Sequence, residues 1–340
     1  MVSFTGSRSF AIDLGNNNTL LTDKERILLS EPSYIVFNDN HSVKAVGEEA
    51  YSIFEKSHDA LHPVKPLRGG VIADYQSAGK MIRMLVDKVY STGFLSKGFD
   101  TIITGVPYHT TPVERRAFSD ALDQFNSRKT NLLFEPLAAA IGMDLDIREP
   151  EGKLLVDIGG GITEVVVISL SGVASFQSLK VAGDSFDEAI RDYFRKQYNL
   201  LIGARTAEQV KKTVGGVFSN LKEAPLPMLV KGKSLAEGIP MSVEVRYEEL
   251  VPVLDKPFSE IEAGIIHTLQ HCPPELAADI YKSGVYVTGG SALLHGVKER
   301  LERTTSLPVH VDAHSLTSVS RGISKALRDP KHYQGVLIEA

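Results

Sequence analysis

The sequence predicts an α/β protein made of two similar halves. Strand-like and helical segments alternate along most of the chain, which is typical of layered α/β folds. Two apolar runs, residues 10–12 and 154–156, each stop at an Asp-x-Gly turn, which begins at Asp13 or Asp157. Sequence typical of a strand meander follows both turns. Because their spacing is too long and the copy number too low for a solenoid, we expect one duplicated half.

In the first half, short apolar and β-branched runs that end at Gly, Pro, Asn or Asp predict strands. Apolar residues at helical spacing predict helices, and Pro112 and Pro136 stand where a helix can begin. The expected strands are residues 10–12, 20–21, 27–29, 33–37, 43–46, 101–106 and 132–134. The expected helices are residues 78–90, 112–126 and 137–143.

The second half follows the same rules. Thr206 is expected to be the N-cap of a helix, and Pro257 is expected to break a longer one. The segment 226–245 contains Gly and Pro between strand-like runs, which indicates a small subdomain. The other expected strands are residues 154–156, 165–168, 173–181 and 285–287. The expected helices are residues 185–197, 206–214, 247–270 and 293–303.

Composition restricts the class of protein. The chain has 340 residues, 43% of them apolar and 23% charged, which suits about two domains with buried cores. The formal net charge of −5 gives no indication of a nucleic-acid partner. Cys272, the single cysteine, cannot form an internal disulfide, which fits a reducing compartment. No apolar run reaches the roughly 18 residues of a transmembrane helix, and residues 1–10 lack signal-peptide features, so we expect a cytoplasmic protein.

Three glycine turns follow buried strands, at Asp13, at Asp157 and at residues 288–290. Glycine lets the backbone approach a ligand closely, and successive backbone N–H groups in such turns bind phosphate oxygens. Two carboxylates beside a polyphosphate suit Mg²⁺, which prefers hard oxygen ligands and retains waters. A single Asp-x-Gly is also a common plain turn. The ordered set of three predicts a cleft between similar halves that holds a Mg-nucleotide, although neither the Walker nor the Rossmann pattern is present.

These turns and several other motifs resemble those of the MreB family, in the superfamily of actin, Hsp70 and sugar kinases. The similarity covers roughly residues 10 to 328. The motifs VERRA and PPELAADI are more typical of MreB than of the wider superfamily. The matching segments are DLGNNNT at 13–19, EPS at 31–33, GVIADY at 70–75, VERRA at 113–117, EPLAAAIG at 135–142, DIGGGITE at 157–164, YNLLIGARTAE at 198–208, PPELAADI at 273–280 and TGGSALLHG at 288–296.

The resemblance implies an actin-like fold in which each half carries a smaller inserted subdomain and the nucleotide lies in the central cleft. The implied first half consists of subdomain IA, residues 1–32, 67–145 and about 315–340, and subdomain IB, residues 33–66. The implied second half consists of subdomain IIA, residues 146–182 and 246–314, and subdomain IIB, residues 183–245.

The resemblance also implies roles for single residues toward ATP and Mg²⁺. Asp13 and Asp157 would face the Mg²⁺, and Glu135 would orient the attacking water with help from Thr163. Without the resemblance, Glu135 reads as a carboxylate favoured at a helix N-terminus. The residues implied to bind the nucleotide are Gly15, Asn16, Asn17, Asn18, Gly159, Gly160, Gly161, Ile162, Gly183, Asp187, Lys211, Thr213, Gly289, Gly290, Ser291 and Ala292.

The chain departs from the family pattern beside these turns. Residues 16–18 are Asn where the family usually has Thr-Ala-Asn. Ile162 replaces a Thr, Thr213 replaces an acidic residue at the nucleoside, and Ser291 replaces the third glycine of TGGG. ATP binding is still expected, whereas the affinity and the rate of hydrolysis stay open.

The implied function is that of a slow ATPase that forms head-to-tail filaments at the inner face of the cell membrane and organises cell-wall synthesis and rod shape. Expected partners are further copies of the chain, membrane lipid, and cell-elongation and wall-synthesis proteins; pairing of protofilaments is left open. Phe94 and Leu95, in the apolar segment 93–99, would contact the lipid. The alternative is that this segment folds back onto the domain.

Two other functions are weighed against the filament. A nucleotide-binding scaffold of the same fold with weak or no hydrolysis is compatible with Ile162 and Thr213. A small-molecule kinase of the superfamily would need an Asp base beside the γ-phosphate, and the sequence offers no candidate for it.

Overall fold

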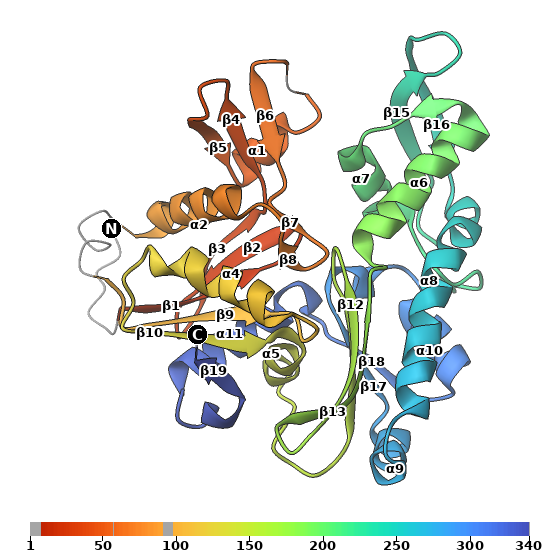
Figure 1. The fold of residues 1–340 in the computed structure, drawn as a ribbon. Helices are drawn as coiled ribbons and strands as arrows, with labels where there is room; N and C mark the ends of the chain where they lie inside the picture. The colour runs from red at the N-terminus through yellow and green to blue at the C-terminus, as the bar shows by residue number, and fades with distance from the viewer. Residues whose placement is uncertain (1–7, 57, 91–97, 340) are drawn as a thin grey trace. The chain divides into compact units, whose positions relative to one another are not determined.

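The computed structural model describes residues 8–56, 58–90 and 98–339. The chain forms two compact units (Figure 1). Unit 1 comprises Met1–Glu149, Leu170–Gly172 and Leu316–Ala340, and unit 2 comprises Pro150–Ser169 and Val173–Ser315. The chain therefore enters unit 2 after Glu149 and returns to unit 1 for its last segment. The four predicted subdomain boundaries remain predictions.

Unit 1 is built on a sheet with the strand order β19-β10-β9-β1-β2-β3. β1 pairs antiparallel with β2 and parallel with β9, and β9 pairs parallel with β10. The aromatic side chains of Phe10, Phe99 and Phe125 meet edge to face in the core of this unit. The strands are β1 (Ser9–Leu14), β2 (Asn18–Thr22), β3 (Ile27–Pro32), β9 (Thr101–Val106), β10 (Lys129–Phe134) and β19 (Leu337–Glu339).

Unit 2 repeats this arrangement, with the strand order β13-β12-β11-β17-β18. As in unit 1, the first strand, β11, pairs antiparallel with the next, β12, and parallel with a later one, β17, which pairs parallel with β18. The order β3-β2-β1-β9-β10 is thus the same as β13-β12-β11-β17-β18, which confirms the predicted duplicated half. The strands are β11 (Lys153–Ile158), β12 (Thr163–Ser169), β13 (Gly172–Leu179), β17 (Val285–Thr288) and β18 (Val309–Val311).

Two helices of unit 1 pack with their backbones almost touching. A Cβ on Gly142 of α5 would lie 1.9 Å from the Ser318 carbonyl oxygen, and one on Gly322 of α11 would lie 1.7 Å from that of Ala138. Only glycine allows this approach. It fixes α5, whose first residue is Glu135, against α11, which itself contacts β1 and β9. The main helices of unit 1 are α2 (Tyr75–Val89), α4 (Pro112–Asp123), α5 (Glu135–Gly142) and α11 (Ser318–Arg328).

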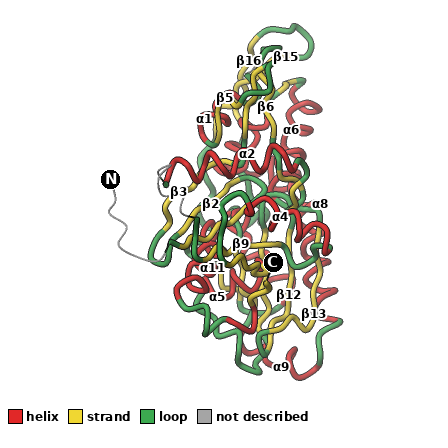
Figure 2. The backbone as a smooth tube through the Cα atoms, turned by 60° about the vertical axis from the view of Figure 1, so that its left-hand side comes forward, coloured by secondary structure: helices red, strands yellow, loops and turns green. Residues whose placement is uncertain are grey.

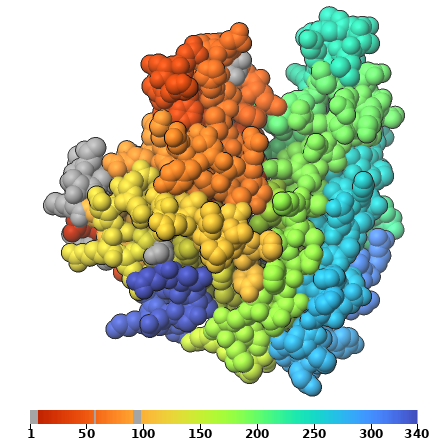
Figure 3. Space-filling model, in the orientation of Figure 1, coloured from red at the N-terminus to blue at the C-terminus, as the bar shows by residue number. Residues whose placement is uncertain are grey.

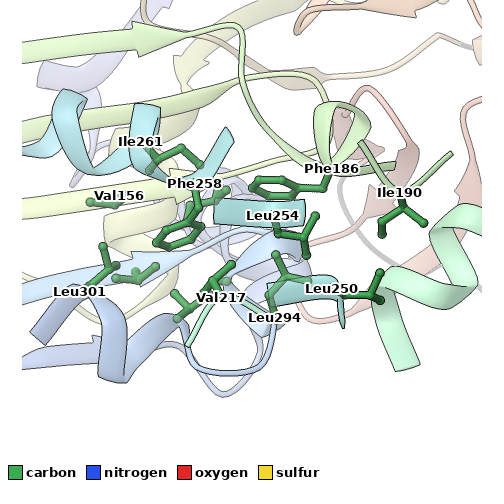
Figure 4. Packing of buried hydrophobic residues seen from close by; sticks show 14 of the residues in the cluster. Val156, Phe186, Ile190, Val217, Leu250, Leu254, Phe258, Ile261, Leu294 and Leu301 are labelled. Atoms are coloured by element: carbon green, nitrogen blue, oxygen red, sulfur yellow. The ribbon is translucent and has the colours of Figure 1, made fainter. Parts of the chain in front are cut away.

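Helices α6 and α8 contribute much of the core of unit 2, where Phe186, Leu254 and Phe258 point toward one another (Figure 4). α8 is continuous, so the predicted break at Pro257 is wrong. An interior proline costs about 3 kcal/mol, but the stripe that this helix buries offsets the cost. The helices of unit 2 are α6 (Gly183–Tyr198), α7 (Ala204–Val214), α8 (Tyr247–Gln270), α9 (Pro274–Ser283) and α10 (Val297–Thr305).

Each unit also carries a small three-stranded sheet. In unit 1 the order is β5-β4-β6, and Tyr34, Val36, Ala45 and Ala50 form a separate small core. In unit 2 the order is β14-β15-β16, and the β15–β16 hairpin ends in an outlying turn, drawn in green in Figure 2. The elements are β4 (Ile35–Asn38), β5 (Val43–Val46), α1 (Glu48–Ile53), β6 (Leu61–Val64), β14 (Leu200–Leu201), β15 (Met228–Ser234) and β16 (Pro240–Val245), with a short hairpin of β7 (Leu67–Arg68) and β8 (Val71–Ile72).

Helix starts show where the local signals fail. Thr206 is not an N-cap, because α7 begins at Ala204 after Gly203, whose backbone is extended. Thr111, by contrast, caps α4 in a capping box with Glu114, one residue before Pro112. The predicted strands at 43–46 and 101–106 match β5 and β9.

Among the described residues, no helix is long and apolar enough to cross a membrane.

Candidate functional site

The first Asp-x-Gly turn joins β1 to β2 in unit 1. Asp13 lies at the end of β1, opposite Leu20, and the chain then turns through Gly15. A Cβ on Gly15 would lie 2.7 Å from the Asn18 carbonyl oxygen, so the turn is too tight for a side chain there. Asn16 is buried and Asn18 is exposed. The sequence therefore predicted both the place of this turn and its need for glycine.

Ser33, quoted only as part of a motif above, holds this turn in place. Its hydroxyl donates to the Gly15 carbonyl at 2.7 Å, and its backbone N–H donates to the Asn17 carbonyl at 2.9 Å. A trans peptide points its C=O and the next N–H in opposite directions. Because the Gly15 carbonyl faces Ser33, the Asn16 N–H faces the other way.

The second turn joins β11 to β12 in unit 2 and is fixed through its carbonyls. The start of α6 supplies two donors: Gly183 N–H bonds the Gly159 carbonyl at 3.1 Å, and Asp184 N–H bonds the Gly160 carbonyl at 2.7 Å. By the same peptide geometry, the N–H groups of Gly160 and Gly161 point away from α6. Successive N–H groups that point the same way form a concavity that suits phosphate oxygens.

Three segments of unit 2 that are distant in sequence meet at this turn: α6, α7 and a short 3₁₀ helix. The Lys211 ammonium, from α7, donates to the Gly183 carbonyl at 3.0 Å and to the Asp187 carboxylate at 2.9 Å. The Ser291 hydroxyl, from the short 3₁₀ helix Gly290–Leu293, donates to the Gly159 carbonyl at 3.0 Å. The structure therefore brings together the predicted residues Gly159, Gly183, Asp187, Lys211 and Ser291.

Burial raises the pKa of the Asp187 carboxyl to about 6, although the Lys211 ammonium opposes this shift. The two partners are nearly buried, with side chains 15% and 8% exposed. Oδ1 of Asp187 has no hydrogen-bond partner among the residues that the structure describes. This carboxylate therefore retains an acceptor beside the turn, held in place by the ion pair.

Asp157 is the next-to-last residue of β11 and lies next to the third glycine turn. It pairs with Thr288 across the parallel strands β11 and β17. Gly289 has φ 87° and lies so close that a Cβ would be 2.4 Å from Asp157 Oδ1. Burial raises the pKa of the Asp157 carboxyl to about 6. A carboxylate that has lost part of its hydration in this way is stabilised by a nearby cation.

Glu135 stands at the N-terminus of α5 in unit 1. Its Cγ lies over Gly105 of β9, where a Cβ would come within 3.2 Å of it. The N-cap of this helix is Phe134, which gives no side-chain cap, and Pro136 follows Glu135. Glu135 is half-buried. Because Gly105 has no side chain, β9 leaves room at this point for the Glu135 side chain at the start of α5.

The remaining predicted residues differ in their surroundings. Thr163 is fully buried, and its hydroxyl donates to the Val181 carbonyl at 2.6 Å. Thr213 is exposed on α7, two residues after Lys211. Ile162 is half-buried, and its carbonyl accepts a bond from Gly159 N–H at 3.0 Å. In the third turn, Gly290 is exposed and Ala292 is buried.

The predicted membrane residues Phe94 and Leu95 lie outside the described residues. Phe99, at the end of the same segment, is described. It is 2% exposed and packs edge to face against Phe10 at 4.7 Å between ring centroids. For Phe99 the structure therefore agrees with the alternative that it folds back onto the domain.

A cavity of about 570 Å³ lies on unit 1 between α2, α4 and the β4–β5 turn. Its lining includes Tyr75, Lys80, Met84 and Gln124, and Figure 3 shows this face with α2 in orange and α4 in yellow. None of the predicted site residues lines it.

Within the described ranges, no group of three or more His, Cys, Asp or Glu side chains could hold a metal ion.

The duplicated sheet order and the glycine turns at equivalent strand ends define an actin-like fold. Solved structures agree: this chain is similar to MreB5 of Spiroplasma citri bound to ADP, with a TM-score of 0.89 and 31% identity over 96% of this chain and 98% of that one. The structure of the same protein bound to AMPPNP gives a TM-score of 0.90 at 31% identity, over 95% and 97% of the two chains.

This chain belongs to the MreB/Mbl family, because the family model described as "MreB/Mbl protein" matches residues 7–335. The cell shape-determining protein MreB of Escherichia coli K12 is 38% identical over 327 residues, which cover 94% of this chain and 93% of that one. The cell shape-determining protein Mbl of Bacillus subtilis 168 is 35% identical over 318 residues, or 93% and 94% of the two chains. The resemblance stated from the motifs is confirmed.

Proposed function

We propose that this protein binds Mg-ATP through its glycine turns and polymerises into filaments at the inner face of the cell membrane, where they organise cell-wall synthesis and rod shape. The observation that carries the proposal is that both Asp-x-Gly turns are fixed through their carbonyls in a chain that belongs to the MreB/Mbl family. The family's named relatives determine cell shape, and MreB5 of Spiroplasma citri has been solved with ADP and with AMPPNP.

Nucleotide binding is supported by the direction of the backbone donors. The N–H groups of Gly160 and Gly161 point away from α6, and that of Asn16 points away from Ser33. We assign these groups to the phosphates, because oriented amides favour anions without a change of conformation. Lys211 and Asp187 would hold the nucleoside end, and Thr213 would contribute less than an acidic residue could.

The carboxylates of Asp13 and Asp157 fit a magnesium ion by their chemistry, since hard oxygen ligands with space for waters suit Mg²⁺. Bound Mg²⁺ would neutralise charge on the phosphates. The raised pKa of Asp157 supports this assignment, because a partly dehydrated carboxylate benefits most from a cation.

For hydrolysis we assign Glu135 the role of orienting and polarising the attacking water. Phosphoryl transfer needs mainly positioning and charge stabilisation, so one oriented carboxylate is sufficient for a slow reaction. Gly105 leaves space beside the Glu135 side chain, and the close packing of α5 on α11 fixes the start of its helix. Thr163 could donate to the water only if its hydroxyl left the Val181 carbonyl.

Self-association is supported by exposed apolar side chains in the small sheet of unit 2 and the loops around it. Leu226 is 83% exposed, Leu229 59% and Ile239 53%, and exposed large apolar side chains offer contact area to a second copy of the chain. Head-to-tail contacts between different surfaces do not close, so they produce a filament. Phe94 and Leu95 would attach this filament to lipid, next to wall-synthesis proteins.

A nucleotide-binding scaffold with little or no hydrolysis is the second candidate. Two observations favour it: Ile162 has no hydroxyl, and the hydroxyl of Thr163 already donates to Val181. Both candidates bind nucleotide, so they differ only in phosphate release.

Nucleotide binding is tested by titrating the full chain with fluorescent ADP and ATP, with Mg²⁺ and with EDTA. Saturable binding that weakens in EDTA is expected. If neither nucleotide binds under either condition, both candidates are excluded, because each of them depends on the glycine turns.

A further inference from the structure

The side chain of Ser291 makes a contact that joins two of the glycine turns. Ser291 is 5% exposed, and its hydroxyl donates to the Gly159 carbonyl at 3.0 Å. The same carbonyl accepts the Gly183 N–H at 3.1 Å. One carbonyl oxygen thus receives a donor from the start of α6 and another from the third glycine turn.

The start of α6 lies close to Ser291 and Lys211, and only glycine fits there without a shift of its neighbours. A Cβ on Gly183 would lie 3.1 Å from Ser291 Oγ, 3.2 Å from Lys211 Nζ and 3.3 Å from the Gly159 carbonyl oxygen. Lys211 is itself fixed by the Gly183 carbonyl and by Asp187. The start of α6 thus has little room for a side chain at position 183, and Ser291 lies close to it and to Gly159.

The bond acts on the orientation of one peptide group. The Gly159 carbonyl and the Gly160 N–H belong to the same trans peptide and point in opposite directions. A donor that holds the carbonyl therefore holds the N–H toward the opposite side, where the phosphates are assigned. Glycine peptides rotate easily, because no Cβ restricts their backbone angles, so such a restraint matters most here.

The first glycine turn, in unit 1, is held by the same kind of hydrogen bond. Gly15 and Gly159 occupy equivalent places, two residues after Asp13 and Asp157, and Ser33 donates its hydroxyl to the Gly15 carbonyl at 2.7 Å. The two serines come from different places in their units: Ser33 directly follows β3, whereas Ser291 lies in the 3₁₀ helix after β17. A serine hydroxyl therefore fixes the first glycine carbonyl of both turns.

We propose that Ser291 is a positioning residue for phosphate binding, which restrains the Gly159–Gly160 peptide and so presets the Gly160 N–H toward the nucleotide. Glycine, the residue of the family motif at this position, has no hydroxyl to donate, so this chain has a restraint that the motif lacks. The inference rests on the proposed nucleotide binding and deepens it.

The test compares Ser291→Ala and Ser291→Gly with the full-length parent. Ser175→Ala is the matched control, because Ser175 is a buried serine of the same unit that also donates to a backbone carbonyl, that of Thr268 at 3.1 Å. Loss of one hydrogen bond predicts about fivefold weaker binding of ADP and ATP in both Ser291 variants. Binding of adenosine, which has no phosphate, should be unchanged, as should ADP binding by the control.

Hydrogen exchange gives a readout that needs no nucleotide. The amides of Gly183 and Asp184, which donate to the turn, should lose protection in Ser291→Ala but not in Ser175→Ala. Equal ADP affinity and equal protection in parent and Ser291→Ala would overturn the inference. An equal loss for ADP and adenosine would also overturn it, because that result indicates general damage. A parent that binds no nucleotide would instead refute the proposed function, and the exchange data would still decide the role of Ser291.

Discussion

Gly289 lies directly against the carboxylate of Asp157, where a Cβ would come within 2.4 Å of Oδ1. The third glycine turn thus covers one side of the Asp157 carboxylate, and burial raises the pKa of that carboxyl to about 6. Such a site is built at a cost in stability, because the ionised form loses hydration in the folded chain.

Asp157→Asn should stabilise the chain and remove Mg²⁺-dependent nucleotide binding. The carboxyl ionises near pH 6 in the folded chain and near its ordinary pKa of 3.8 in the unfolded chain. The folded chain therefore binds more protons between these values, and this group lowers stability as pH rises from 4 to 6. The gain of the variant should be about 0.5 kcal/mol at pH 4 and about 3 kcal/mol above pH 7.

Urea unfolding of parent and Asp157→Asn between pH 4 and 8 measures this difference. Asp192→Asn, which removes a surface ion pair on α6, is the control and should change stability by less than about 0.5 kcal/mol. A constant difference across the pH range, or a less stable Asp157→Asn, would contradict the raised pKa of this carboxyl in the folded chain.

Glu135→Gln should slow phosphate release while ATP binding is retained. A positioned acid or base contributes about a hundredfold or more, and glutamine keeps the size of the side chain without its charge. Glu114→Gln is the control, because Glu114 is also a first-turn glutamate of a unit 1 helix. Phosphate release is followed with a coupled assay under saturating Mg-ATP. Equal rates in parent and Glu135→Gln would assign Glu135 to the helix terminus alone and favour the scaffold.

Arg300 should be essential for the stability of unit 2. Its guanidinium is 5% exposed and bonds Glu262 through two nitrogens at 2.6 and 2.9 Å. It also bonds Asp255 and the Val217 carbonyl, which joins α10 to α8 and to the segment after α7. Arg300→Met leaves the Glu262 carboxylate buried without its partner, which costs about 3–5 kcal/mol.

Chemical unfolding of Arg300→Met and of the double variant Arg300→Met/Glu262→Leu checks this prediction. The double variant should recover part of the loss, because it no longer buries an uncompensated charge. A single variant within about 1 kcal/mol of the parent would show that water or nearby groups already compensate Glu262.

Phe94→Ser/Leu95→Ser should reduce co-sedimentation with liposomes of anionic lipid at least tenfold, since each large apolar side chain contributes roughly 1.5–3 kcal/mol when buried. Leu170→Ser is the control, because Leu170 is an apolar residue of unit 1 that is 68% exposed. Equal sedimentation of the double variant and the parent would place membrane contact elsewhere or exclude it.

The sequence predicted the duplicated sheet because the same signals precede both turns. Strand runs that end at Asp13 and Asp157 are visible without any knowledge of packing. The same approach failed at Pro257, where a local rule predicts a break but the buried face of α8 keeps the helix continuous. It failed also at Thr206, because Gly203 already provides the extended residue before α7. Tertiary packing decides such cases, and local sequence does not record it.

The candidate site was only partly visible in the sequence. Glycines at strand ends identify the turns, but the roles of Ser33 and Ser291 depend on donors that come from other segments. The ion pair of Lys211 with Asp187 likewise joins two helices, α6 and α7. For Glu135 the sequence alone suggests only a carboxylate that is favoured by the helix dipole. The structure adds its position over Gly105, which the sequence does not show.

The central claim is that Mg-ATP drives this chain to assemble. The most direct test is electron microscopy and sedimentation of the purified chain with Mg-ATP, Mg-ADP or EDTA, with and without liposomes. Filaments that form with Mg-ATP, and that are lost in Asp157→Asn, are the predicted result. A chain that binds nucleotide but forms no polymer under any of these nucleotide or lipid conditions would contradict the claim.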